Sequence, residues 1–140
     1  MMTTIEEALE GSTPLAAKVR AGGPYGSPAA LVDQMRALLP TLSDEEKVAT
    51  LNAHPRIGED RRRLSSLSLE EQGTEVLPEL GRLNVEYERR FGFRFVVFVN
   101  RRPKSEIVEV LRQRLRRSRH EEMDEGLRAI VDIAADRLKA

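Results

Sequence analysis

The chain has no cysteine and only two histidines, and its 23 acidic side chains balance its 23 basic ones. Without cysteine, a disulfide scaffold, a thiolate nucleophile and a cysteine-rich metal site are excluded. The histidines lie far apart in the sequence, without a His-x-x-x-His pattern or an aspartate cluster, so we expect no metal site. The balanced charge provides no general attraction to nucleic acid or to a membrane surface, and we expect neither as a partner.

Long apolar runs are also absent. No stretch approaches the length of a membrane span, and residues 1–16 carry acidic side chains where a signal peptide carries basic ones, so we expect a soluble protein inside the cell. A chain of 140 residues is long enough for one domain and too short for two, which assigns residues 1–140 to a single domain. The Gly- and Ala-rich residues 1–26 are its least defined part, and we allow for partial disorder there.

Helix start and stop signals occur throughout the rest of the chain. A serine followed by proline and two Ser-x-x-Glu capping boxes mark helix starts, and a glycine after a periodic apolar run marks a helix end. These signals are Ser27-Pro28, Ser43 with Glu46, Ser68 with Glu71, and Gly92. The apolar periodicity predicts helices over 28–39, 43–53, 78–91, 105–116 and 121–138, with another beginning after Ser68.

Residues 93–99 have a different pattern. They cluster phenylalanine and valine as a short extended run, but no second run of this kind offers a strand partner. We therefore expect buried extended chain packed across helices. The predicted fold class is all-α: a compact single-domain helical bundle with one short extended segment.

His54 occupies the most informative position in the sequence, in the pentapeptide His-Pro-Arg-Ile-Gly that ends the helix over 43–53. Pro55 has no amide hydrogen and disfavours helical geometry in the preceding residue, so His54 is expected to leave the helix. A histidine there could perform acid–base chemistry near neutral pH. A helix cap or a partly buried polar residue is the alternative interpretation. The other histidine, His120, lies in a polar stretch and is expected at the surface.

Arg137 interrupts the apolar stripe of the last predicted helix. It follows Ile130 by seven positions and Ile133 by four, so it projects from nearly the same side as these residues. An inward arginine needs an anionic partner, either a protein carboxylate such as Glu71 or the carboxylate of a ligand, because burial of an unpaired guanidinium is costly. The alternative is a side chain that snorkels to solvent at a fraying helix end.

Several arginines are concentrated before and at the start of the last predicted helix, at positions 112, 114, 116, 117 and 119. Such a cluster could bind nucleic acid or an acidic partner, which would make the chain a non-catalytic helical interaction module. Glutamates at 106, 109, 121 and 122 and an aspartate at 124 dilute the positive charge, and aromatic residues are absent from the cluster. A solvated helix face is the simpler interpretation.

Four blocks in order along the chain together match one family. They are Ala53-His54-Pro55-Arg56-Ile57-Gly58; Ser68, Glu71 and Gln72; the run from Leu83 through Tyr87 and Arg90-Phe91-Gly92-Phe93 to Val99; and Ile133 to Leu138. From about residue 27 onward, the chain resembles 2-oxo-4-hydroxy-4-carboxy-5-ureidoimidazoline (OHCU) decarboxylase of the bacterial type. This enzyme of the ureide pathway completes the conversion of urate to (S)-allantoin.

The resemblance implies an all-α homodimer that acts on a small-molecule substrate without a metal or an organic cofactor. It also implies a cytoplasmic enzyme, since the last three residues are not a peroxisomal address. By this resemblance His54 is the catalytic acid/base, and Glu71 is a second catalytic residue. Substrate contacts are expected from Pro55, Ser68, Gln72, Phe95, Val97, Val99 and Arg137.

The implied reaction is decarboxylation of OHCU to (S)-allantoin, in which the C=N bond of the ring accepts the electron pair left by carbon dioxide. The sequence leaves open whether His54 assists at the 4-hydroxyl or delivers the proton that fixes the handedness of the product. It also leaves open a diverged family member that acts on or senses a related ureide or imidazoline acid, besides the interaction module.

Overall fold

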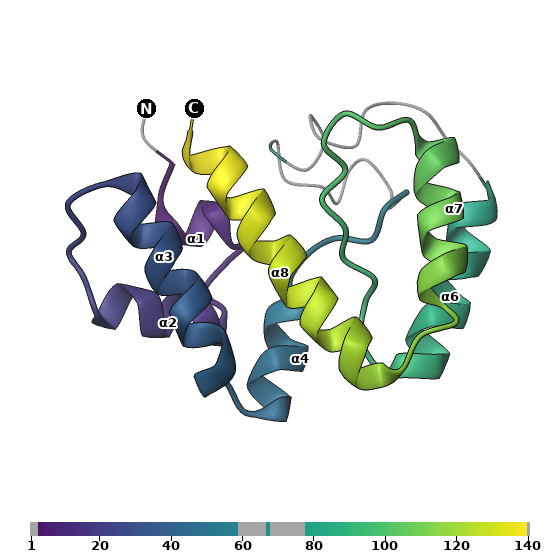
Figure 1. Ribbon diagram of the computed structural model, residues 1–140, viewed down its shortest axis with the longest axis horizontal. Coiled ribbons are helices and arrows are strands. Elements are labelled where there is room, and N and C mark those ends of the chain that lie inside the picture. Colours follow the sequence, from purple (N-terminus) through teal and green to yellow (C-terminus); the bar gives the residue numbers. More distant parts are fainter. Residues whose placement is uncertain (1–2, 59–66, 68–77, 140) are drawn as a thin grey trace.

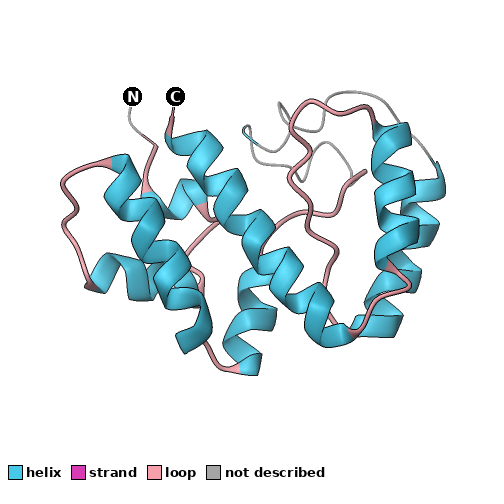
Figure 2. Ribbon diagram, in the orientation of Figure 1, coloured by secondary structure: helices cyan, strands magenta, loops and turns pink. Residues whose placement is uncertain are grey.

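The computed structural model describes residues 3–58, 67 and 78–139, and every element in these ranges is helical (Figures 1 and 2). No strand occurs among the described residues, in agreement with the predicted all-α fold. The elements are α1 (Ile5–Ala8), α2 (Pro14–Ala21), α3 (Pro28–Leu38), the 3-10 turn η1 (Leu39–Thr41), α4 (Asp44–Asn52), α6 (Pro78–Phe91), α7 (Lys104–Arg114) and α8 (Arg119–Leu138).

The predicted helix starts are formed by the expected caps. The Ser27 hydroxyl accepts the N–H of Ala30 before α3. Before α4, the Ser43 hydroxyl accepts the N–H of Glu46, whose carboxylate in turn accepts the N–H of Ser43. The expected capping box of Ser68 with Glu71 lies outside the described residues.

Residues 3–26 contain two helices that the sequence pattern did not indicate. Helix α1 spans four residues and α2 spans eight, and each begins after a threonine whose hydroxyl accepts a backbone N–H. Both contribute to the core, where Ala8 of α1 and Leu15 and Val19 of α2 are fully buried. Helices this short carry too few periodic positions to be recognised from an apolar stripe.

The long helix α8 crosses the molecule between two groups of helices, with α1 to α4 along one side and α6 and α7 at the other end (Figure 1). It packs against α1, α3, α4 and α6. A Cβ atom built on Gly126 would lie 2.8 Å from Cδ2 of buried Leu51, so α4 and α8 approach closely there. None of the helices in the described ranges has the length and apolar character needed to cross a bilayer.

The extended segment, residues 93–99, connects α6 to α7 and is buried along most of its length, as predicted. It begins after Gly92, whose φ of 84° ends α6 in the left-handed region. The ring of Phe95 packs edge-on against Tyr87 of α6, with 5.3 Å between the ring centroids. The segment therefore lies as a loop across the helices and completes their core.

Candidate active site

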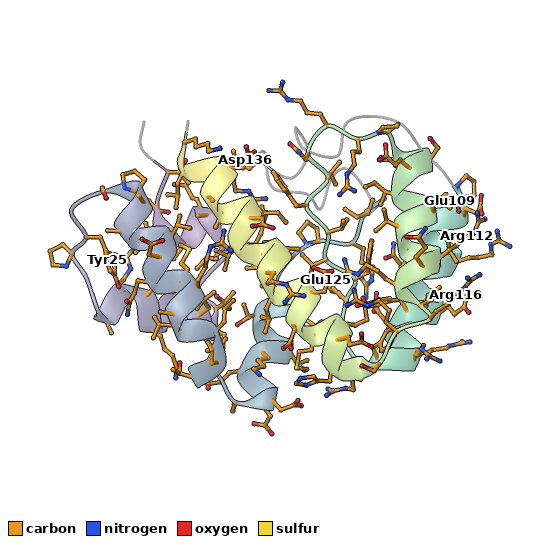
Figure 3. The ribbon with its side chains drawn as sticks, viewed as in Figure 1. Tyr25, Glu109, Arg112, Arg116, Glu125 and Asp136 are labelled. Atoms are coloured by element: carbon orange, nitrogen blue, oxygen red, sulfur yellow. The ribbon has the colours of Figure 1, made fainter. Side chains whose placement is uncertain are left out.

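A cavity of about 370 Å³ lies between the end of α4, the extended segment and the last turns of α8. Asp136, labelled in Figure 3, marks the end of α8 that contributes to it. The lining comprises His54, Pro55 and Ile57 after α4, residues 95–101, and Ile133, Asp136 and Arg137 of α8. Three parts of the chain that are distant in sequence thus form its described walls.

Six of the nine site residues expected from the sequence line this one cavity. They are His54, Pro55, Phe95, Val97, Val99 and Arg137. The other three, Ser68, Glu71 and Gln72, lie outside the described residues. The structure therefore places the His-Pro corner, the extended segment and the late arginine around a common space.

His54 lies just beyond α4, which ends at Asn52, and only 3% of the residue is exposed. Neither ring nitrogen has a hydrogen-bond partner among the described residues. Burial, reinforced by the positive charge of Arg137, lowers the pKa of His54 to about 4, while Glu10 and the backbone at Thr50 act in the opposite direction. The imidazole is therefore neutral at neutral pH and can accept a proton.

Polar contacts fix the His-Pro corner relative to the extended segment. The side-chain oxygen of Asn52 accepts the backbone N–H of Arg94 at 2.9 Å, and the Arg94 guanidinium donates to the His54 carbonyl at 3.1 Å. Next to this corner, the Asn84 amide donates to the Ile57 carbonyl at 2.9 Å. These contacts hold two walls of the cavity in a defined relative position.

Arg137 points inward, so the alternative of a snorkelling side chain is wrong. Its side chain is 2% exposed, and Nη2 lies 2.8 Å from Oε1 of Glu10, a carboxylate that the sequence did not identify as a partner. Nη1 donates to the carbonyl of Glu7 at 3.0 Å and approaches that of Ala8 at 3.5 Å. The end of α1 thus supplies the acceptors for the guanidinium.

The carbonyls and the N–H groups of the extended segment differ in their hydrogen bonding. The carbonyl of Val96 accepts from Arg114 at 2.8 Å, and those of Phe98 and Val99 accept from Arg102 at 2.6 and 3.1 Å. The backbone N–H groups of residues 96–99 donate to no described residue. Since buried backbone donors are costly to leave unpaired, these groups are suited to a ligand in the cavity.

The cavity also contains residues that the sequence did not indicate. Asn100 and Arg101 form a turn with φ values of 48° and 63°, although neither is glycine. Asp136 adds a carboxylate beside Arg137. An asparagine tolerates the left-handed region better than most residues and was the available signal for this turn. No group of three or more potential metal-ligating side chains occurs in the part of the chain that the structure describes.

The arginine cluster consists mostly of paired side chains. Arg112 of α7 pairs with Glu79 and Glu109. Arg112 and Glu109 are both labelled in Figure 3. Arg117 pairs with Glu125 at 3.1 Å, and Arg119 with Asp44 at 3.1 Å. His120 lies at the surface as expected, with a side chain that is 86% exposed. Most of the cluster's positive charge is thus compensated within the chain.

Arg114 contradicts the expectation of a solvated face, because it is 6% exposed and belongs to a buried polar cluster with Tyr87 and Glu122. Its Nε donates to Oε1 of Glu122 at 2.7 Å, and the Tyr87 hydroxyl donates to the same oxygen at 2.7 Å. The guanidinium also lies over the ring of Phe95, 4.7 Å from its centroid. This cluster ties α6, α7 and α8 to the extended segment.

Comparison with known proteins extends the match over nearly the whole chain. A family model named OHCU decarboxylase matches residues 1–139. The chain is 31% identical over 140 residues to a 2-oxo-4-hydroxy-4-carboxy-5-ureidoimidazoline decarboxylase of Haloferax volcanii, covering 94% of this chain and 83% of that protein. It is also 31% identical over 138 residues to a uric acid degradation bifunctional protein of Bacillus sp. strain TB-90, of which it spans only 27%.

Two solved structures share the fold. An OHCU decarboxylase crystallised in the presence of (S)-allantoin superimposes with a TM-score of 0.76 at 22% identity, covering 95% of this chain and 92% of the other. An (S)-allantoin synthase gives a TM-score of 0.67 at 23% identity, covering 96% of this chain and 47% of the other. With the family match over residues 1–139, the chain belongs to the OHCU decarboxylase family.

Proposed function

We propose that the chain is a carboxy-lyase that converts OHCU to (S)-allantoin and carbon dioxide without a cofactor, with His54 as the acid/base. The observation that carries this proposal is the buried neutral His54, which shares one cavity with Arg137. Membership of the family supports the reaction, and the relative in Haloferax volcanii is named for it.

The cavity suits a small polar heterocycle. Its volume of about 370 Å³ lies in the usual range for small-molecule sites, roughly 300 to 1,000 Å³. Phe95 and Val97 provide apolar surface, whereas Arg137 and the backbone N–H groups of residues 96–99 provide donors for the substrate's anionic and carbonyl oxygens. Glu71 and Gln72 are proposed to hold polar groups of the ring and of the ureido arm.

The carbon–carbon bond to the carboxylate breaks first, and carbon dioxide leaves without the bonding electrons. That pair forms a double bond to the ring carbon that bears the ureido arm, while the C=N pair moves onto the ring nitrogen. The nitrogen takes a proton from a water molecule, and the hydroxide left behind combines with the released carbon dioxide to form bicarbonate. The substrate is thus its own electron sink. The residues of the cavity orient the ring.

His54 then moves one proton from oxygen to carbon. The neutral imidazole accepts the proton of the hydroxyl as the carbonyl forms, and the resulting imidazolium donates a proton to the carbon that bears the ureido arm. At neutral pH the ring is unprotonated and has a nitrogen free for the first transfer, and the lowered pKa makes the imidazolium a stronger acid for the second. Delivery from one side of the cavity produces one hand of allantoin.

The proposal includes the homodimeric state and the cytoplasmic location that the family resemblance implies. It assigns no role in nucleic-acid binding to the arginine cluster, since Arg112, Arg114, Arg117 and Arg119 have carboxylate partners within the chain. The elution volume of the purified protein tests the dimer. A single species of monomer size at micromolar concentration would contradict it.

The proposed activity is tested with freshly generated OHCU, followed by its ultraviolet decay and by circular dichroism of the product. A reaction without protein is required as the reference, because OHCU decays spontaneously. We expect decay well above that reference and a signal of (S)-allantoin. Decay at the reference rate with racemic product would contradict the proposal and favour a different ureide or imidazoline acid as the substrate.

A further inference from the structure

We propose that Glu10 is a positioning residue of the active site, whose carboxylate fixes the Arg137 guanidinium in the cavity wall. Glu10 follows α1, in the part of the chain where the sequence indicated no site residue. The effect of Glu10 on turnover rests on the function proposed above, whereas its effect on the orientation of Arg137 does not. The proposal therefore assigns the first turns of the chain to the site.

The contacts of Arg137 carry this inference. Its planar fork has acceptors on both terminal nitrogens: Nη2 meets the Glu10 carboxylate at 2.8 Å, and Nη1 meets the Glu7 carbonyl at 3.0 Å. The exposed fractions of the two side chains are 2% for Arg137 and 11% for Glu10, so solvent screens this ion pair little. Such a two-sided hold fixes the plane of the guanidinium as well as its position.

The backbone at Glu10 provides a second observation. Its φ of 62° lies in the left-handed region, which is unfavourable for a residue with a side chain. Glycine would adopt this conformation freely, and Gly11 follows immediately. The strained conformation brings the Glu10 carboxylate to Arg137, which lies 127 residues away in the sequence.

If Glu10 only compensated the charge of Arg137, its replacement would change KM in the opposite direction from that expected for a positioning residue. Removing the negative charge of Glu10 would make the cavity more positive, which would favour an anionic substrate and lower KM. Loss of the guanidinium's orientation would instead raise KM, because Arg137 would no longer present its donors in one direction. The sign of the change in KM therefore separates the two roles.

The test compares Glu10→Gln, Glu10→Asp and a matched control, Glu6→Gln. Glu6 belongs to α1 and pairs with Arg20 at 2.8 Å, away from the cavity lining. We expect KM for OHCU to rise roughly tenfold in Glu10→Gln, the loss typical of one weakened charged hydrogen bond, and less in Glu10→Asp, which keeps the charge. Glu6→Gln should stay within about twofold of the wild type because it changes an exposed pair.

A second measurement follows the order of the Arg137 guanidinium directly and does not depend on turnover. NMR of guanidinium N–H groups in isotope-labelled protein, assigned by the signals lost in Arg137→Lys, should show slowly exchanging Arg137 protons in the wild type and in Glu6→Gln but not in Glu10→Gln. Unchanged Arg137 signals, or an unchanged or lowered KM in Glu10→Gln, would overturn the proposal. If wild type does not turn over OHCU, the proposed function fails and the NMR comparison alone decides the role of Glu10.

Discussion

At the residue scale, the two histidines differ in their exposure to solvent and in their surroundings. His54 is 3% exposed and lies in the cavity lining, whereas the His120 side chain is 86% exposed beside Asp124. The proline after His54 was sufficient to predict that the residue leaves its helix. Its burial was not predictable, because the extended segment and α8, which cover it, come much later in the sequence.

The depressed pKa of His54 predicts a pH dependence of stability. Between the unfolded value of 6.5 and the folded value of about 4, the unfolded chain binds more protons, so the free energy of unfolding falls as the pH is lowered. The full loss over this window is about 3 kcal/mol at 1.36 kcal/mol per pKa unit. Urea unfolding of wild type and His54→Gln at several pH values measures it.

His54→Gln should not show the fall in the free energy of unfolding that His54 causes at acid pH. The surface residue His120 contributes equally to both proteins. The difference in unfolding free energy between wild type and His54→Gln should therefore change with pH between 6.5 and 4. Parallel curves for the two proteins would mean that the folded and unfolded states protonate residue 54 alike.

At the scale of the elements, the sequence predicted those helices that carry their own start and stop signals. The structure confirms three such signals. Ser27 and Ser43 cap the starts of α3 and α4, and Gly92 ends α6. Helix α7 begins after Pro103 without a side-chain cap, and its observed start at Lys104 is one residue before the expected one. A helix boundary can therefore be predicted from the sequence where a residue next to it forms the cap.

One glycine within α6 and one just after it give a matched pair of predictions with opposite signs. Gly81 lies within the helix and Gly92 just after it with φ of 84°, and an added Cβ would meet nothing within 4 Å at either position. Gly81→Ala should stabilise the protein by about 0.5 to 1 kcal/mol through helix propensity. Gly92→Ala should destabilise it by about 1 to 2 kcal/mol, because alanine resists the left-handed region.

Chemical denaturation of the two variants beside wild type measures both effects with the same substitution. Because neither site is crowded, packing does not contribute to the difference. Equal changes in unfolding free energy for the two variants would contradict the assigned role of Gly92 as the end of α6.

At the scale of the whole molecule, the contacts that complete the site join residues that no local pattern relates. Arg137 finds Glu10 across 127 positions, and Arg114 joins the Val96 carbonyl to Glu122 of another helix. The stripe on α8 predicted that Arg137 faces inward, but periodicity cannot choose among the many carboxylates of the chain. For the same reason the sequence pattern does not separate Arg114 from its exposed neighbours.

The buried polar cluster predicts strong coupling between Arg114 and Glu122, whose side chains are 7% and 0% exposed. Glu122→Leu should cost about 3 to 5 kcal/mol, because it leaves the buried guanidinium without its main counterion. Adding Arg114→Met should recover much of that loss, since an apolar pair can replace a buried ion pair. A double-mutant cycle of unfolding free energies measures the coupling, and additive effects of the two substitutions would contradict it.

The proposed role of His54 as the acid/base of an OHCU decarboxylase is tested by the initial rate of (S)-allantoin formation. This rate is recorded by circular dichroism for wild type and His54→Gln. We expect a folded variant whose rate falls by a factor of about 100 or more toward that of the spontaneous reaction. His120→Gln, altered at the exposed histidine, should remain near the wild-type rate. Retention of most activity and of the product's handedness by His54→Gln would contradict this role of His54.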